Sequence, residues 1–386
     1  MRIPLLAALF LTVPAVAACT QNTNGGTGPE LGGGAITVTS TNDVCEVSAT
    51  EAPAGKLTFT VTNGGSEVTE FYLLGEDGRI VGEVENIGPN LTRELVVNAA
   101  AGKYVTTCKP GMSGKGIQAD FTVTPSDVAV ATSSSQDQLI HAAEEHYGGY
   151  VQEQSDRLLA KTGKFVSAYK AGDDAAARTL YADARTHWER IETVAESFGD
   201  LDPKLDAREA DLEPGQKWTG WHRIEKDLWP ARAERYAALS TKQRAVYADD
   251  LLANTRTLDG RIGKLEFTVD QIANGSRGLL EEVAKAKVTG EEEYWSRTDL
   301  WDFQANVDGA RVGVEGVEPI LQEKDPALAK TLSARFAELQ KLLDAQRVGN
   351  GFRYYDELSP DQVKRLAGAV NALSEPLSRL TAAVLS

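Results

Sequence analysis

The sequence predicts two folded parts, a β-sandwich followed by an all-α helical bundle. Short runs of alternating apolar and polar residues fill positions 35–125, and Gly, Asn, Asp and Pro clusters separate them, which is typical of a β-sandwich. Over residues 136–386 apolar residues recur at helical spacing and β-branched runs disappear, which indicates long amphipathic helices in a bundle. With 386 residues, 42% of them hydrophobic, the chain can form a sizeable core in each part.

The N-terminus has the pattern of a targeting segment. Arg2 precedes a mostly apolar run, and the small residues that end at Ala18 lead directly to Cys19. This pattern predicts a bacterial lipoprotein signal peptide over residues 1–19, with Cys19 lipidated, and an ordinary secretory peptide is the alternative. The Gly- and Asn-rich residues 20–34 predict a flexible tether. We therefore expect an extracytoplasmic protein, either lipid-anchored to the cell membrane or periplasmic.

The net charge of −16 limits the classes of partner. Nucleic acids and anionic membrane surfaces are polyanions, so a strongly acidic chain is poorly suited to bind either. Membrane attachment is expected through lipid alone, because no later run approaches the roughly 18 apolar residues of a membrane-spanning helix. An acidic chain is compatible with a protein that gathers cations.

Two cysteines, Cys45 and Cys108, remain once Cys19 is assigned to the lipid anchor. An even pair in an oxidising compartment predicts a structural disulfide, and a metal site is the alternative. A blue-copper centre needs two histidines and a cysteine, often with an axial methionine. Residues 35–125 contain no histidine, so Met112 is expected to pack rather than to bind copper.

The stretch Gly220–Trp229 places an imidazole and a carboxylate on an apolar helix face. Trp218, His222, Glu225 and Trp229 follow helical spacing and share one stripe. A charge buried there without a partner would cost several kcal/mol. The pattern therefore favours a bound cation as the partner of His222 and Glu225.

A second helix, predicted over residues 174–198, supplies more carboxylates. Glu192 lies about 40° around that helix from Trp188, and Glu189 lies one step further out, so both border its apolar seam. Facing helices that offer Glu-x-x-Glu and His-x-x-Glu are typical of carboxylate-rich metal sites in bundles. Imidazole and carboxylate ligands without a thiolate suit iron, zinc or manganese.

These blocks, in this order, resemble a known family. The G-x-H-x-x-E helix follows the E-x-x-E helix, S-F-G-D-L-D-P lies between them, and T-D-L-W-D-F-Q-A-N-V-D-G-A comes later. This arrangement is similar to the imelysin-type domain of the EfeO family, the extracytoplasmic iron-binding components of EfeUOB-type iron uptake systems. The sandwich, with Tyr104-x-x-x-Cys108-x-Pro110, resembles the cupredoxin-like domain that many members carry first.

The resemblance implies a function as well as a fold. It implies that the protein captures iron, Fe3+ or Fe2+ with ferric iron favoured, and passes it to an EfeU-like iron permease. An EfeB-like haem peroxidase is the second implied partner. In the cupredoxin-like domain it implies Cys45, Glu70 and Cys108 as copper ligands, which is the alternative to the disulfide.

Further acidic residues are weaker candidates for the iron site. Asp206 follows the E-x-x-E helix and is expected either to bind the metal or to cap a helix. Glu282 lies nearer than Glu281 to the apolar arc of its helix and is preferred as an additional ligand. The like-charged run from Glu291 to Glu293 is expected to be solvated. The predicted iron ligands are His222, Glu225, Glu189, Glu192, Asp206 and Glu282.

Other polar residues are assigned to supporting positions. His141 and His146 are expected on a solvated or locally paired helix face, and His187 is a weaker ligand candidate than His222. Asp299 and Asn306 share a helical stripe. They are expected to hold helices together through buried hydrogen bonds, and the alternative is that Asp299 and Asp302 support the metal ligands.

Enzyme activity is less favoured than binding. Imelysin domains have been associated with peptidase activity through H-x-x-E, but zinc peptidases commonly use H-E-x-x-H, which is absent. A G-x-S-x-G nucleophile motif is also absent. A metallopeptidase and a copper-assisted ferroxidase or electron-transfer module remain as alternatives.

Overall fold

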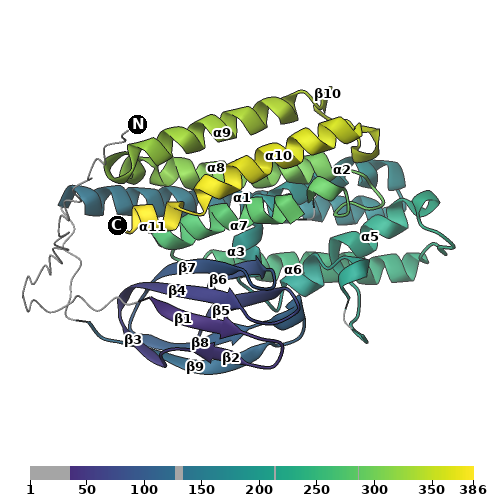
Figure 1. The fold of residues 1–386 in the computed structure, drawn as a ribbon. Coiled ribbons are helices and arrows are strands. Elements are labelled where there is room, and N and C mark those ends of the chain that lie inside the picture. Colours follow the sequence, from purple (N-terminus) through teal and green to yellow (C-terminus); the bar gives the residue numbers. More distant parts are fainter. Residues whose placement is uncertain (1–34, 127–133, 213, 286) are drawn as a thin grey trace, which may run out of the picture. The chain divides into compact units, whose positions relative to one another are not determined.

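The structure is a computed structural model that describes residues 35–126, 134–212, 214–285 and 287–386 (Figure 1). The predicted signal peptide, Cys19 and the tether lie outside these residues, as does most of the segment between the two folded parts. Among the described residues, none of the helices has both the length and the apolar character that crossing a membrane requires.

The first part is a sandwich of two sheets. One sheet has the strand order β2-β1-β4-β7 and the other β3-β9-β8-β5-β6. Pairing is mostly antiparallel, but β1 runs parallel to β4 and β3 runs parallel to β9. The predicted β-sandwich is thus confirmed, with strands β1 Ile36–Ser40, β2 Cys45–Val47, β3 Glu51–Pro53, β4 Gly55–Asn63, β5 Thr69–Gly75, β6 Ile80–Ile87, β7 Thr92–Ala99, β8 Gly102–Cys108 and β9 Ile117–Thr124.

Aromatic side chains from both sheets form the core of the sandwich. Phe59 on β4 lies with its ring centroid 5.3 Å from that of Phe71 on β5 and 5.6 Å from that of Phe121 on β9. All three are buried. The alternating pattern that predicted these strands therefore has its expected cause, because every second side chain points between the sheets.

A disulfide between Cys45 and Cys108 connects the two sheets. Cys45 begins β2 in one sheet, and Cys108 ends β8 in the other. Of the two alternatives for this pair, the structure contains the disulfide, and in that state neither sulfur is the thiolate that a copper site needs. Glu70 is buried nearby and accepts a 2.5 Å hydrogen bond from the Tyr72 hydroxyl. A copper-binding role for these residues stays a prediction.

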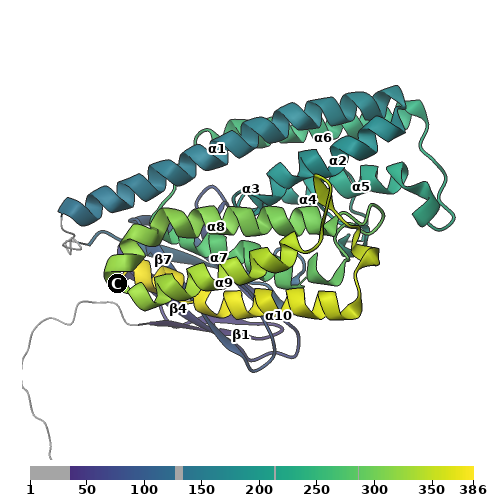
Figure 2. The ribbon, with the colours of Figure 1, turned by 90° about the horizontal axis from the view of Figure 1, so that it is seen from above.

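In the described residues of the second part, helices and their connections are joined by one short hairpin, β10 Arg347–Val348 and β11 Gly351–Phe352. Helix α1 packs along α2 and α6, α7 packs along α8, and α9 packs along α10 (Figures 1 and 2). This confirms the predicted helical bundle, with helices α1 Ser134–Ala171, α2 Asp174–Glu189, α3 Glu192–Glu196, α4 Asp202–Leu205, α5 Gly220–Leu228, α6 Thr241–Ile262, α7 Val269–Lys285, α8 Asp299–Lys324, α9 Pro326–Asp344, α10 Pro360–Leu377 and α11 Leu380–Val384.

Several helices begin at residues that satisfy their free N–H groups. Ser240 and Gln243 form a capping box at the start of α6, and Ser359 and Gln362 do the same at α10. Asp325 accepts a hydrogen bond from a backbone N–H in the first turn of α9. Local sequence therefore sets these helix starts.

The structure corrects the continuous helix predicted over residues 174–198. The helix is interrupted at Ile191, whose φ of −125° and ψ of 15° are not helical. The Asn306 side-chain amide on α8 donates to the Glu189 carbonyl at 2.7 Å. Gly309 allows α8 to approach closely, since a Cβ at that position would lie 2.4 Å from the Arg190 carbonyl oxygen. Packing against α8 thus accompanies the break between α2 and α3.

Candidate metal centre

Helix α5 carries the His-x-x-Glu motif and begins at a glycine with a positive φ angle. Gly220 has a φ of +86°, and a Cβ there would lie 2.1 Å from the Leu205 carbonyl oxygen. Only glycine fits such a close approach in this conformation. The prediction that Trp218 shares the helical stripe of His222 and Glu225 is wrong, since Trp218 precedes α5 and donates its indole N–H to the Ala207 carbonyl instead.

The motif side chains of α5 are buried. His222 and Glu225 are both 0% exposed, and the imidazole Nδ1 lies 3.2 Å from a Glu225 oxygen. The other Glu225 oxygen accepts the backbone N–H groups of Trp295 at 2.8 Å and Ser296 at 2.6 Å. The α5 carboxylate therefore ties the 291–298 segment to the centre. The His222 Nε2 has no hydrogen-bond partner among the described residues.

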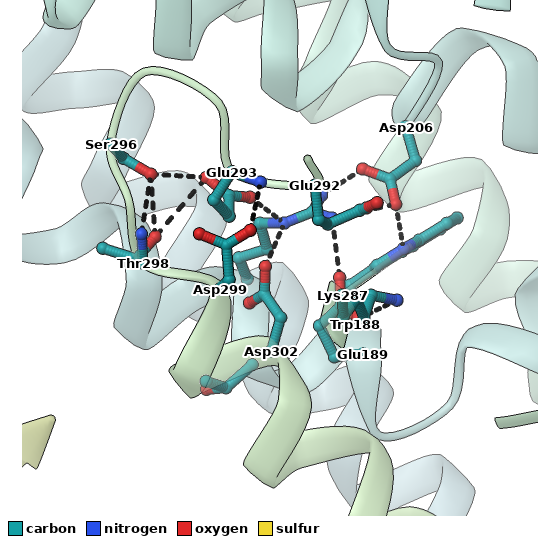
Figure 3. Close-up of polar contacts among 12 residues, drawn as sticks. Trp188, Glu189, Asp206, Lys287, Glu292, Glu293, Ser296, Thr298, Asp299 and Asp302 are labelled. Atoms are coloured by element: carbon teal, nitrogen blue, oxygen red, sulfur yellow. Dashed lines mark hydrogen bonds and ion pairs between the residues drawn. The ribbon is translucent and has the colours of Figure 1, made fainter. Parts of the chain in front are cut away.

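Helices α2, α3 and α4 bring three predicted ligands to the same place. Glu189 is 0% exposed at the end of α2, and Glu192 is 5% exposed at the start of α3. Asp206 follows α4 and accepts the Trp188 indole N–H at 2.7 Å (Figure 3). Asp206 also lies 3.4 Å from the His222 Nε2. Asp206 is thus buried beside the imidazole.

Two further carboxylates were missed because the Glu291–Glu293 run was predicted to be solvated. Glu292 is 5% exposed and Glu293 is 0% exposed. Glu292 lies 3.5 Å from the His222 Nε2, and Glu293 accepts a 2.6 Å hydrogen bond from the Ser296 hydroxyl (Figure 3). The only signal for burial in the sequence is the aromatic pair that directly follows the run.

Three overlapping groups of side chains each bring their ligand atoms within 4.8 Å of one another. Two of them contain His222, and the third is made of carboxylates alone. The groups are His222, Glu225 and Glu293; Asp206, His222 and Glu292; and Glu189, Glu192, Asp206 and Glu292. Five of the six predicted iron ligands therefore converge, while Glu282 is partly exposed and belongs to none of these groups. Their role as ligands stays a prediction.

Two buried basic side chains, Arg185 and Lys287, occupy the centre alongside the carboxylates, and both are 0% exposed. The Arg185 guanidinium contacts five acids at ion-pair distance: Glu189, Asp206, Glu292, Glu293 and Asp302. The Lys287 ammonium lies 2.7 Å from both Glu189 and Glu192. Neither basic residue was predicted.

Acidic side chains nevertheless outnumber basic ones. Eight buried carboxylates face three buried groups that can be cationic, namely Arg185, Lys287 and His222, and the half-buried Arg208 lies 3.5 Å from one of the carboxylates. The eight are Glu189, Glu192, Asp206, Glu225, Glu292, Glu293, Asp299 and Asp302. Such an excess buried away from water is costly unless protons or a multivalent cation compensate it.

The pKa values of the centre reflect this excess of negative charge. Burial and Arg185 would lower the pKa of His222, but the hydrogen bond to Glu225 and the nearby carboxylates of Glu292 and Asp206 raise it to about 10. Burial and the nearby Glu225 carboxylate hold the pKa of Glu293 well above its usual value. In the absence of a metal the imidazole is therefore protonated at neutral pH, and a metal that binds it must release that proton.

A surface pocket reaches His222 from outside. Its lining includes Arg208, Glu209, Asp211, Glu291 and Trp295. Acidic residues outnumber basic ones along it, so the pocket is suited to admit a cation.

Other residues predicted near the site either contact the candidate ligands and Arg185 or lie away from the centre. Asp302 contacts Arg185, and Asp299 accepts the Glu293 backbone N–H at 3.1 Å (Figure 3). Asn306 donates to a Glu192 carboxylate oxygen at 2.8 Å. These contacts combine the two alternatives, because the same hydrogen bonds join helices and position candidate ligands. His141 is exposed and lies 3.5 Å from Glu144, as expected for a locally paired face.

His187 is buried on another face of α2 and predicts a pH effect. Its Nδ1 lies 2.7 Å from the Gln154 side-chain oxygen, and burial and Arg190 lower its pKa to about 4. An unfolded histidine has a pKa of about 6.5, so the unfolded state binds this proton more strongly. The stability that neutral His187 contributes is complete above about pH 6.5 and is lost as the pH falls towards 4.

A His187→Gln variant should therefore lose about 2 kcal/mol less stability than the wild type between pH 7 and pH 4.5. Urea unfolding at both pH values, with a chelator present, measures the difference. If both proteins lost the same stability between pH 7 and pH 4.5, the pH effect could not be assigned to His187.

The matches to known families agree with this architecture. Residues 143–380 match the imelysin family, and residues 5–123 match a cupredoxin-like domain. The iron uptake system component EfeO of Yersinia pseudotuberculosis serotype I is 37% identical over 348 residues, which cover 89% of this chain and 90% of that protein. The chain belongs to the EfeO family. EfeO of Escherichia coli O157:H7 is 36% identical over 350 residues, with the same shares covered.

This result confirms the resemblance inferred from the motifs. The imelysin match contains all the residues of the three ligand groups, and it follows the cupredoxin-like match in this chain. The names of these relatives describe iron uptake components and mention no catalytic activity.

Proposed function

We propose that this EfeO-family chain binds ferric iron at the carboxylate and imidazole centre and delivers it to a membrane permease. The observation that carries the proposal is the convergence of His222 with Glu225, Glu293, Asp206 and Glu292 at a buried, strongly acidic point. Carboxylate oxygens are hard donors, and one imidazole adds a ligand that iron accepts. Iron uptake is also the role that the names of the relatives give.

The location and partners belong to the same proposal. The signal sequence that ends at Cys19 supports an extracytoplasmic, lipid-anchored protein. An anchored iron carrier requires a membrane permease as the acceptor. A haem peroxidase is the proposed second partner and would set the oxidation state of the iron.

Metal titration of the chain from Thr20 to Ser386 tests the proposal. Ferric iron, supplied as its nitrilotriacetate complex, is titrated into the wild type and into a His222→Ala/Glu225→Gln double variant. We expect the double variant to lose at least about a hundredfold in affinity, since it lacks two direct ligands.

The chain offers a matched control in its other H-x-x-E pair. A His141→Ala/Glu144→Gln variant makes the same chemical change on α1, where the exposed imidazole lies 3.5 Å from Glu144 and the Glu144 carboxylate also accepts a hydrogen bond from the Val269 backbone. It should bind iron like the wild type. Equal iron binding by the wild type and the His222→Ala/Glu225→Gln variant would refute the proposed site.

A further inference from the structure

The all-carboxylate group of the centre already holds a cation, and that cation is a lysine. Lys287 begins a short 3-10 turn after α7 and is 0% exposed. Its Nζ lies 2.7 Å from a Glu189 oxygen and 2.7 Å from a Glu192 oxygen. These two acids belong to the group that Asp206 and Glu292 complete, with ligand atoms within 4.8 Å of one another. An ammonium thus sits against carboxylates arranged closely enough for a metal ion.

A second observation marks this place as a ligand site rather than an acidic cluster alone. The His222 Nε2 is buried and has no hydrogen-bond partner among the described residues. It lies 3.4 Å from Asp206 and 3.5 Å from Glu292, both members of the all-carboxylate group. A buried imidazole nitrogen without a hydrogen bond is costly unless another ligand engages it.

Of the two resident cations, Lys287 is the one suited to leave. Arg185 contacts five carboxylates with a planar, rigid guanidinium, including three members of the group. Among the described residues, Lys287 makes ion pairs with two carboxylates, through a point charge on a flexible four-carbon chain. A multivalent ion can replace the ammonium by offering the same carboxylates more charge.

Resting on the proposed iron-binding function, we propose that Lys287 is the resident counter-cation that iron displaces from Glu189 and Glu192, and that it determines affinity and charge selectivity. With Lys287 in place, an incoming ion must compete with a positive charge already inside the ligand shell. Repulsion from the ammonium grows with the charge of the incoming ion, so this competition lowers the affinity of a trivalent ion more than that of a divalent one.

The first test is a Lys287→Gln variant, which keeps most of the side-chain volume and removes the charge. Removing a unit positive charge from the ligand shell should raise ferric affinity on the order of ten- to a hundredfold. Affinity for Zn2+ should rise less, so the ratio of Fe3+ to Zn2+ affinity should also increase. If Lys287 had only a structural role, the Lys287→Gln variant would instead lose affinity for both ions.

Two variants control for charge and position. Lys287→Arg keeps the charge at this place and should show no gain in affinity. Lys161→Gln removes the same charge from a lysine that pairs with Asp183 on the surface, and it should bind like the wild type. Circular dichroism in a chelator verifies that each variant is folded.

If Lys287→Gln does not fold without metal, Glu192→Gln provides the test. It removes one carboxylate from the proposed ligand shell and leaves the ammonium paired with Glu189. We expect ferric affinity to fall about tenfold or more. Unchanged ferric affinity in Glu192→Gln, or affinity in folded Lys287→Gln that is no higher than in the wild type, would overturn the inference.

These outcomes are separate from the test of the proposed function. Loss of iron binding in His222→Ala/Glu225→Gln, together with wild-type affinity in Lys287→Gln, would refute only the role of Lys287. Equal binding by the His222→Ala/Glu225→Gln variant and the wild type would refute the iron site itself.

Discussion

An Arg185→Met variant is expected to lose on the order of 3–5 kcal/mol of stability when the protein is metal-free. Arg185 is 0% exposed and contacts carboxylates from α2, α8, the residue after α4 and the 291–298 segment. Methionine fills similar volume but leaves those acids without their main counter-charge. The melting temperature in a chelator should fall by roughly 10 °C.

Ferric iron should restore part of this loss. A bound multivalent ion supplies the positive charge that Arg185 gives to the metal-free protein, so the difference in melting temperature between variant and wild type should narrow in iron. Arg157→Met serves as the control, because Arg157 makes only an exposed ion pair with Glu153 and should cost less than about 1 kcal/mol. An equally large difference with and without iron would mean that Arg185 is structural alone.

The part of the centre that lies on regular helices was predictable from the sequence. His222 and Glu225 are one helical turn apart on a strongly amphipathic helix, so their burial follows from periodicity. Glu189 and Glu192 border the apolar seam that Trp188 defines, and they reach the same centre despite the break at Ile191. The break itself depends on contacts from α8, more than 100 residues later, and no local pattern encodes it.

The remaining charged residues could not be predicted, because their burial depends on partners distant in the chain. Arg185 and Glu189 have the i, i+4 spacing of an ordinary surface ion pair. Glu292 and Glu293 belong to a run of like charges without periodicity, which normally indicates solvation. Only the folded chain shows that Arg185 reaches both of them and compensates their charge.

The Cys45–Cys108 pair illustrates a different limit of prediction from the sequence. The number of cysteines allowed either a disulfide or a metal site, and the missing histidines excluded only one type of copper centre. The structure adds that the two residues lie in opposite sheets with their Cα atoms 5.5 Å apart, a separation usual for disulfides. Sequence spacing carries no information about that distance.

A Gly220→Ala variant should reduce iron affinity although it alters no ligand. The alanine Cβ would lie 2.1 Å from the Leu205 carbonyl oxygen, and the φ of +86° is unfavourable for any residue with a side chain. Relief of this clash has to move the start of α5 away from α4. His222 lies two residues later, so its imidazole would move relative to Asp206, which directly follows Leu205 in sequence.

We expect this variant to lose on the order of 3 kcal/mol of stability and at least about tenfold in ferric affinity. Gly172→Ala is the matched control, since Gly172 also has a positive φ of 77° but no atom lies within 4 Å of an added Cβ. The Gly172→Ala control should lose about 1 kcal/mol of stability and keep its iron affinity. Because the two variants share the backbone strain and differ in the clash, a loss of iron affinity in Gly220→Ala alone would show that the close approach of α5 to α4 positions the imidazole for the metal. Equal iron affinity in both variants would show that the centre tolerates movement of α5.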